Sequence, residues 1–336
     1  MRLAFLLLVF GGGIGVQAGE TWHWHRDDSG LAIQGYDPVA YFRQNQATPG
    51  KAKITTSYQG LTYRFANKAH RAAFRESPDQ YLPRYGGWCA FAAGVDPEKT
   101  GWGAVRFPAD PKSFKIVDGE LYLFAKVPNF DAKARWEAEG HPAMKQRADA
   151  FWANRERLAG QVGELPQGMN PRAPMETAQF KPFLGTWTNE VRYLIDPEKQ
   201  TYGPPTKGTW TFDFGWDGFT IRDEYRVDGQ AGSGGPAYRW FDPRTKQWVM
   251  TYLPVNQPSE QIWVMNGSFD TEGNLRAERD GVDFQGRPIK ARIHFTQIKS
   301  DSFRWSTDWS YDEGKTWVEN IMVATNRRIH GPQASK

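Results

Sequence analysis

The sequence is poor in cysteine, in long apolar runs and in net charge. Cys89 is the only cysteine among 336 residues, so no disulfide can form within the chain. The apolar run at 3–10 is too short to span a bilayer comfortably. The 42 Lys and Arg against 38 Asp and Glu leave +4, with the positive residues scattered rather than clustered. These features predict no membrane span and no nucleic-acid partner.

Several catalytic signatures are also missing. The sequence has no phosphate-binding glycine loop and no nucleophile elbow. Without a second cysteine, an oxidised Cys89 has no resolving partner, which argues against a disulfide oxidoreductase. A Cys-His hydrolase would need a third, orienting group that the sequence does not locate.

The first residues indicate export. Arg2, the apolar run and the small-residue site Val16-Gln17-Ala18 predict a signal peptide over residues 1–18, cleaved after Ala18. The mature protein would then be periplasmic or secreted. A lone thiol in such an oxidising compartment is expected to be buried, liganded or functional.

The length predicts two domains, and the aromatic content of 15% with 15 Trp favours aromatic-rich strands. Near the mature N-terminus, Trp22-His23-Trp24-His25 would place both histidines on one side of an extended chain. Two ligands alone rarely make a metal site, so we expect an exposed aromatic tail here.

Residues 31–158 carry signals of a small α+β domain. Ile54–Tyr58 and Leu61–Phe65 predict a hairpin, as do Phe114–Val117 and Glu120–Phe124. Asn67 is positioned to cap a helix that ends before Pro78. Residues 131–158 predict a helix interrupted at residues 140–142.

Spaced motifs in this region resemble a YHS domain. They are Gly35-Tyr36-Asp37-Pro38-Val39-Ala40-Tyr41-Phe42, Tyr63-Arg64-Phe65-Ala66, and Tyr85-Gly86-Gly87-Trp88-Cys89-Ala90. The match is narrower to an exported, single-cysteine, selenoprotein-related branch. Cysteine-rich metal binding does not carry over, because Ala40, Ala66 and His70 stand where related metal-binding domains have cysteines. Cys89 and His70 remain as the candidate metal ligands.

Thiolate and imidazole together suit a soft or borderline metal, and copper is the metal we expect if Cys89 and His70 share a site. A neighbouring histidine would also lower the pKa of the thiol and make Cys89 reactive. The alternative is a buried, inert cysteine beside a packed histidine.

After a Gly- and Pro-rich linker over residues 159–174, the pattern changes to alternating apolar and polar residues. About ten strands separated by turn signals predict an all-β antiparallel domain over residues 175–330. With no helix to cover a sheet, closure into a barrel is expected. The domain resembles lipocalin-like barrels, with Trp187 on the first strand and Arg327 or Arg328 on the last as the typical Trp-Arg pair.

Asp223 is a carboxylate on an otherwise apolar strand face with Ile221 and Tyr225. It either lines the barrel interior or marks a bulge, and the pattern does not decide between them. In the first case Asp223 and Tyr225 are candidate ligand-binding residues.

The sequence thus predicts an exported binding protein, with a metal ion at the YHS-like domain and a small apolar or aromatic ligand in a hollow barrel. Two alternatives stay open. One is a redox or isomerase-like enzyme that uses Cys89 as a reactive thiol. The other is a structural or interaction protein whose barrel is filled by its own side chains.

Overall fold

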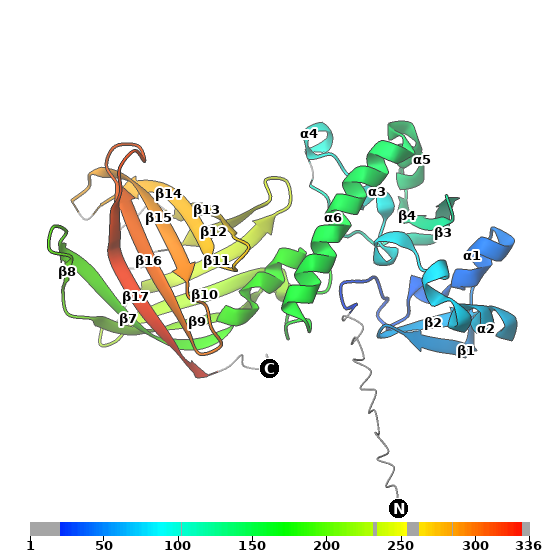
Figure 1. Cartoon of the computed structure of the whole chain (residues 1–336), viewed down its shortest axis with the longest axis horizontal. Coiled ribbons are helices and arrows are strands. Elements are labelled where there is room, and N and C mark those ends of the chain that lie inside the picture. The colour runs from blue at the N-terminus through cyan, green and yellow to red at the C-terminus, as the bar shows by residue number, and fades with distance from the viewer. Residues whose placement is uncertain (1–20, 102, 231–233, 254–261, 284, 331–336) are drawn as a thin grey trace, which may run out of the picture.

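A computed structural model describes residues 21–101, 103–230, 234–253, 262–283 and 285–330. Within them, a part made of helices and hairpins is followed by a closed β-barrel, and helix α6 (His141–Val162) leads from the first to the second (Figure 1). The predicted signal peptide lies outside the described residues. Of the helices described, none combines the length and apolar character needed to cross a bilayer.

The N-terminal part contains short helices and three separate hairpins. Its helices are η1 (Ile33–Gly35), α1 (Pro38–Gln44), α2 (Lys68–Glu76), η2 (Pro78–Tyr81), η3 (Arg84–Gly87), α3 (Ala90–Ala93), α4 (Pro97–Thr100), α5 (Ala132–Glu139) and α6. Its hairpins pair β1 (Lys51–Tyr58) with β2 (Leu61–Phe65), β3 (Asp110–Val117) with β4 (Glu120–Phe124), and β5 (Lys126–Val127) with β6 (Phe130–Asp131). Both predicted hairpins are confirmed.

The helix boundaries follow local chemistry. The Asn67 side chain accepts a hydrogen bond of 2.8 Å from the backbone N–H of His70 and so caps α2, as predicted. Gly140, with a φ of 89°, separates α5 from α6. Pro142 follows at the start of α6, where its missing N–H costs nothing. The predicted interruption of the long helix is therefore confirmed.

The prediction of an exposed aromatic tail over residues 22–25 is wrong. Trp22, His23 and His25 are all buried. The indole of Trp22 donates to the carbonyl of Gly163 at 2.6 Å, and the indole of Trp88 donates to the carbonyl of His23 at 2.8 Å. These side chains are buried because residues distant in the sequence provide apolar surface for them to pack against, which removes them from water.

The burial of His25 makes the stability of this part dependent on pH. Burial, with positive Arg172 as the second cause, lowers the pKa of His25 from 6.5 to about 4. Between these values the unfolded chain binds a proton that the folded chain does not, so the free energy of unfolding should fall as the pH falls from about 6.5 to about 4.

Thermal unfolding of wild type and of His25→Gln between pH 7 and pH 5 measures this dependence. Glutamine does not titrate, so the variant should lose less stability than wild type over that range. Equal losses in the two proteins would contradict the assignment to His25.

The predicted linker is packed rather than free. Residues 159–162 still belong to α6, and the following segment joins a buried apolar cluster formed by Trp22, Leu158, Ala159, Met169, Ala173, Met175 and Ala178. A buried ion pair joins Arg155 of α6 to Glu176 of the 3-10 helix η4 (Met175–Phe183), with 2.5 Å between nitrogen and oxygen. The N-terminal part and the barrel therefore meet through a buried interface.

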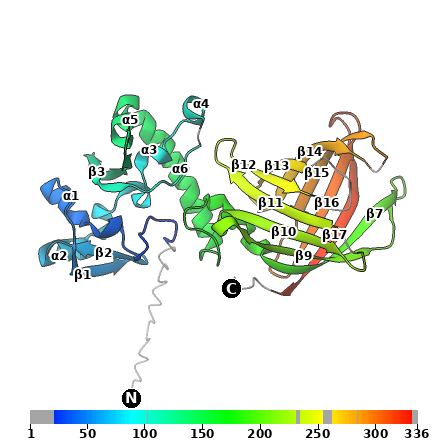
Figure 2. The same cartoon turned by 180° about the vertical axis from the view of Figure 1, so that it is seen from behind.

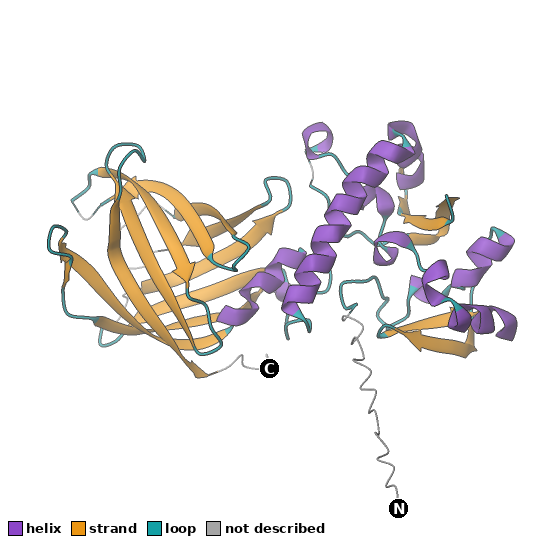
Figure 3. Cartoon of the chain, viewed as in Figure 1, coloured by secondary structure: helices purple, strands orange, loops and turns teal. Residues whose placement is uncertain are grey.

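The C-terminal part is a ring of antiparallel strands (Figures 2 and 3). In chain order its elements are β7 (Gly185–Asp196), β8 (Thr201–Tyr202), β9 (Thr206–Gly215), η5 (Trp216–Gly218), β10 (Thr220–Val227), β11 (Gly234–Asp242), β12 (Gln247–Tyr252), β13 (Trp263–Phe269), β14 (Leu275–Val282), β15 (Pro288–Thr296), β16 (Ser302–Ser310) and β17 (Val318–His330). The last strand pairs with β7 and closes the ring, while β8 only extends β7. The predicted closed barrel of ten strands is confirmed.

Helix η4 plugs one end of the barrel with two phenylalanines. Phe180 and Phe183 are fully buried, and their rings pack against aromatic rings of the barrel wall. The ring centroid of Phe180 lies 4.6 Å from that of Trp248, and the centroid of Phe183 lies 5.2 Å from that of Phe303. This end of the interior is therefore filled by side chains.

Trp187 and Arg328 close the seam between the first and last barrel strands. The guanidinium carbon of Arg328 lies 4.0 Å from the Trp187 ring centroid. The same guanidinium donates to the carbonyl oxygens of Pro182 at 2.6 Å, Leu184 at 2.5 Å and Ser300 at 2.6 Å. The Trp-Arg contact expected from the sequence is present, and Arg328 is the arginine that makes it.

Replacing Arg328 by alanine should destabilise the barrel, because three charge-assisted hydrogen bonds and the contact with the indole are lost. We expect a loss of about 2 to 3 kcal/mol in the free energy of unfolding. Chemical denaturation followed by near-UV circular dichroism measures it. Arg327→Ala is the matched control, since its side chain is exposed on the same strand. A loss no larger than in this control would contradict the role of Arg328.

Candidate ligand-binding site

A cavity of about 390 Å³ lies inside the barrel. Phe295 lines it and also contacts Phe183 of the plug, with 5.6 Å between the ring centroids, so the cavity begins where the plug ends. Most of its wall is aromatic or aliphatic, including Trp210, Tyr225, Tyr252, Trp263, Phe295 and Trp309. Its volume is in the range of small-molecule sites, about 300 to 1,000 Å³.

A buried ion pair lies on the cavity wall. Arg239 Nε is 2.6 Å from Asp223 Oδ2, and the indole N–H of Trp210 donates to Asp223 Oδ1 at 2.7 Å. Only 3% of Asp223 and 4% of Arg239 are exposed to solvent. A buried carboxylate is tolerated when its oxygens are paired in this way, because the partners replace the lost water.

The position of Asp223 resolves the choice that the sequence left open. β10 pairs without a register shift with β9 on one side and β11 on the other, and Asp223 stands opposite Phe212 and Ala237. There is no bulge at this position, so the bulge interpretation is wrong. Asp223 and Tyr225 both face the cavity.

Two tyrosines provide hydroxyl groups in the same space. Burial raises the pKa of Tyr225 well above its usual value of 10.0, and it raises the pKa of Tyr252 to about 12. Both phenols therefore stay protonated at neutral pH and can donate or accept a hydrogen bond to a bound molecule. Tyr225 was a predicted site residue, and Tyr252 was not.

Two cavity arginines were missed from the sequence. Arg239 lies between Ala237 and Phe241 on the inward face of β11, and Arg279 follows Ala277 on the inward face of β14. The criterion that selected Asp223, a charged residue on an apolar strand face, would have found both. Burial lowers the pKa of Arg279 to about 10, so its guanidinium is still charged at neutral pH.

Cys89 lies in the core of the N-terminal part. Its Sγ accepts a hydrogen bond from the backbone N–H of Ala125 at 3.2 Å, and only 1% of the residue is exposed. Burial raises the pKa of the thiol, which favours the neutral form over the thiolate. This is the environment of an unreactive cysteine.

His70 has a partner of its own. Its Nδ1 lies 2.6 Å from Oδ2 of Asp37, a fully buried carboxylate that also accepts from the backbone N–H groups of Val39 and Ala66. Asp37 thus caps α1 and holds the imidazole at the same time. In the part of the chain that the structure describes, no three His, Cys, Asp or Glu side chains gather as metal ligands. Copper binding by Cys89 and His70 stays a prediction.

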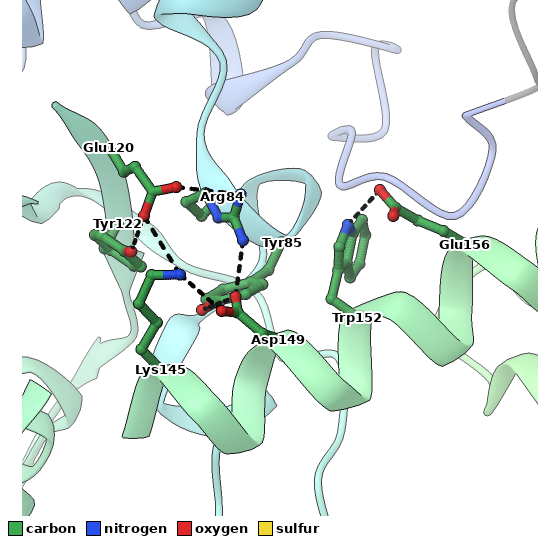
Figure 4. Close-up of polar contacts among 8 residues, drawn as sticks. All are labelled: Arg84, Tyr85, Glu120, Tyr122, Lys145, Asp149, Trp152 and Glu156. Atoms are coloured by element: carbon green, nitrogen blue, oxygen red, sulfur yellow. Dashed lines mark hydrogen bonds and ion pairs between the residues drawn. The ribbon is translucent and has the colours of Figure 1, made fainter. Parts of the chain in front are cut away.

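A network of charged side chains connects η3, the turn before Cys89, to α6 (Figure 4). Asp149 accepts from Arg84 at 2.7 Å, from Lys145 at 2.7 Å and from the Tyr85 hydroxyl at 3.0 Å. Glu120 pairs with Arg84 at 3.3 Å, so two carboxylates balance two cations. The charges of this network cancel, and its members are hydrogen-bonded to one another. The network therefore has a structural role.

Gly86 in that turn cannot be replaced without a rearrangement. Its φ is +58°, and a Cβ built there would lie 2.6 Å from the Trp152 ring. Gly86 therefore allows close packing against α6, and both glycines are buried, so the pair presents no open surface beside Cys89.

The thiol of Cys89 should resist alkylation in the folded protein at pH 7.5, because it is buried and its pKa is raised. We expect iodoacetamide to label it at least about a hundredfold more slowly than the same thiol in denaturant, as measured by intact mass. Fast labelling of the native protein would support the enzyme alternative instead. A Cys89→Ala protein, which cannot be labelled there, controls for reaction at other side chains.

No protein-family model matches this chain, and no curated protein matches it in sequence. The resemblances to YHS and lipocalin-like domains therefore stay predictions. The closed barrel rests on the strand pairing itself.

Proposed function

We propose that this protein is an exported binding protein whose barrel holds one small, mainly apolar ligand. The observation that carries the proposal is the cavity of about 390 Å³, with an aromatic wall and a few polar groups. Such a combination is typical of small-molecule sites, because apolar contact supplies affinity and isolated polar groups set the orientation. Export rests on the predicted signal peptide.

The geometry favours binding over catalysis. The oxygens of Asp223 are already committed to Arg239 and Trp210, so this carboxylate is poorly placed to act as a base. Cys89 belongs to the core of the N-terminal part, whereas the residues that line the cavity belong to the barrel. A substrate held in the barrel would therefore not meet the thiol.

A neutral hydrophobic fluorophore tests the proposal on the full-length mature protein. We expect N-phenyl-1-naphthylamine to bind at one equivalent and to quench tryptophan emission, since Trp210 and Trp309 line the cavity. Ala237→Phe places a phenyl group into the cavity and should weaken binding at least about tenfold. Glu224→Phe adds the same ring on the outer face of the neighbouring strand and should bind as wild type does.

Melting curves of both variants establish that they are folded. Absence of saturable binding to wild type would favour the structural alternative, in which the barrel takes no guest. Unchanged binding to a folded Ala237→Phe protein would place the probe outside the cavity and also contradict the proposal.

A further inference from the structure

The charges that the described residues bring to the cavity do not balance. Among these residues, the charged ones that line it are Asp223, Arg239 and Arg279. Asp223 pairs with Arg239 at 2.6 Å, so Arg279 is left as one excess positive charge. A partly buried cation without a counter-ion is unfavourable, and an anion placed beside it would remove that cost.

Arg279 forms no ion pair with any carboxylate of the described residues. Its guanidinium carbon lies 4.0 Å from the Trp263 ring centroid, and Nη1 donates to the backbone carbonyl of Asp280 at 3.3 Å. The nearby carboxylate of Glu278 is taken by two arginines on the outer face, Arg276 at 2.8 Å and Arg292 at 3.0 Å. The stack on Trp263 holds the plane of the guanidinium and leaves N–H groups at its edge for another acceptor.

Between the described residues of β13 and β14, the ladder of backbone hydrogen bonds ends beside this arginine. The β13–β14 ladder runs from Phe269–Leu275 to Asn266–Glu278 and then stops, although β13 begins three residues earlier, at Trp263. Across from that unpaired stretch, β14 continues from Arg279 to Val282, where it pairs with β15 alone.

A surface pocket of about 520 Å³ lies over the end of this ladder. Its lining includes Asn266 and Glu278 of the last pair, and Val264 and Asp280 beyond it. Arg279 lines both this pocket and the inner cavity. It therefore stands where the interior of the barrel meets the outside.

We propose that Arg279 binds the carboxylate of an amphiphilic monoanion whose apolar part fills the cavity. This inference rests on the proposed function and adds the chemical class of the ligand. A guanidinium matches a carboxylate with two parallel hydrogen bonds, and the single excess charge matches a monoanion. The aromatic wall accommodates the rest of the molecule, and Tyr225 and Tyr252 supply further donors for any polar group it carries.

Displacement of N-phenyl-1-naphthylamine from the full-length protein at pH 7.5 tests this with two matched probes, decanoate and decanol. Wild type should bind decanoate about ten- to a hundredfold more tightly, the range of a charge-assisted pair. Arg279→Met keeps the apolar stem and removes the charge, so the preference should fall to about onefold while decanol affinity changes less than about twofold. Arg276→Met, on the outer face of the same strand, should retain the wild-type preference.

The outcomes separate the two proposals. If wild type binds the fluorophore and decanol but binds decanoate no more tightly, or if Arg279→Met keeps the preference, the anion anchor is wrong and the binding function stands. If neither the fluorophore nor decanol binds, the proposed function fails and the anchor fails with it.

Should Arg279→Met not fold, Arg279→Lys serves instead, since losing the planar fork should reduce the preference several-fold. An unchanged preference in that variant would overturn the inference.

Discussion

The pairing of β17 with β7 is the constraint on which the C-terminal half depends. It removes both edges of the sheet, and it fixes ten strands around one interior. A barrel of about eight strands is just wide enough for side chains to fill, and the diameter grows with strand number. Ten strands therefore enclose more space than the side chains of the wall fill on their own. Part of this space is filled by residues from outside the wall, and part is the cavity.

Two features divide that interior. Phe180 and Phe183 fill one end from η4, and the Asp223–Arg239 pair stands where the aromatic packing gives way to the cavity. Arg239 belongs to both regions, since its guanidinium carbon lies 5.6 Å from the Phe180 ring centroid while the residue also lines the cavity. Buried pairs of this kind are weak contributors to stability, and apolar residues could fill the same space. In the proposed binding function, this pair would supply polar surface to a bound ligand.

Periodicity in the sequence was sufficient for the strands, for the barrel and for Asp223, because alternation along a strand determines which side chains face inward. Periodicity does not predict where the β13–β14 ladder ends or which N-terminal side chains are buried. The end of the ladder depends on how the two neighbouring strands diverge in space, and the alternation of residues along a strand carries no information about this divergence. The burial of His23 and His25 depends on apolar surface supplied by Trp88 and Trp152, more than sixty residues away. Arg279 differs from these features, because the alternation of Leu275, Ala277 and Arg279 along β14 already predicts that its side chain faces inward.

The 3-10 helix η4 connects the two halves of the molecule physically. Glu176 at its start pairs with Arg155 of α6, while Phe180 and Phe183 further along fill the end of the barrel. Between them, Gln179 accepts a hydrogen bond of 3.1 Å from the indole of Trp248 on the barrel wall. The plug that bounds the cavity is thus held from outside by the N-terminal part and from inside by the barrel. A barrel cut free at residue 175 would leave Glu176 without its buried partner, which is costly for a charge in that position. The cavity is in this sense a property of the whole chain, and the N-terminal part contributes to it without lining it.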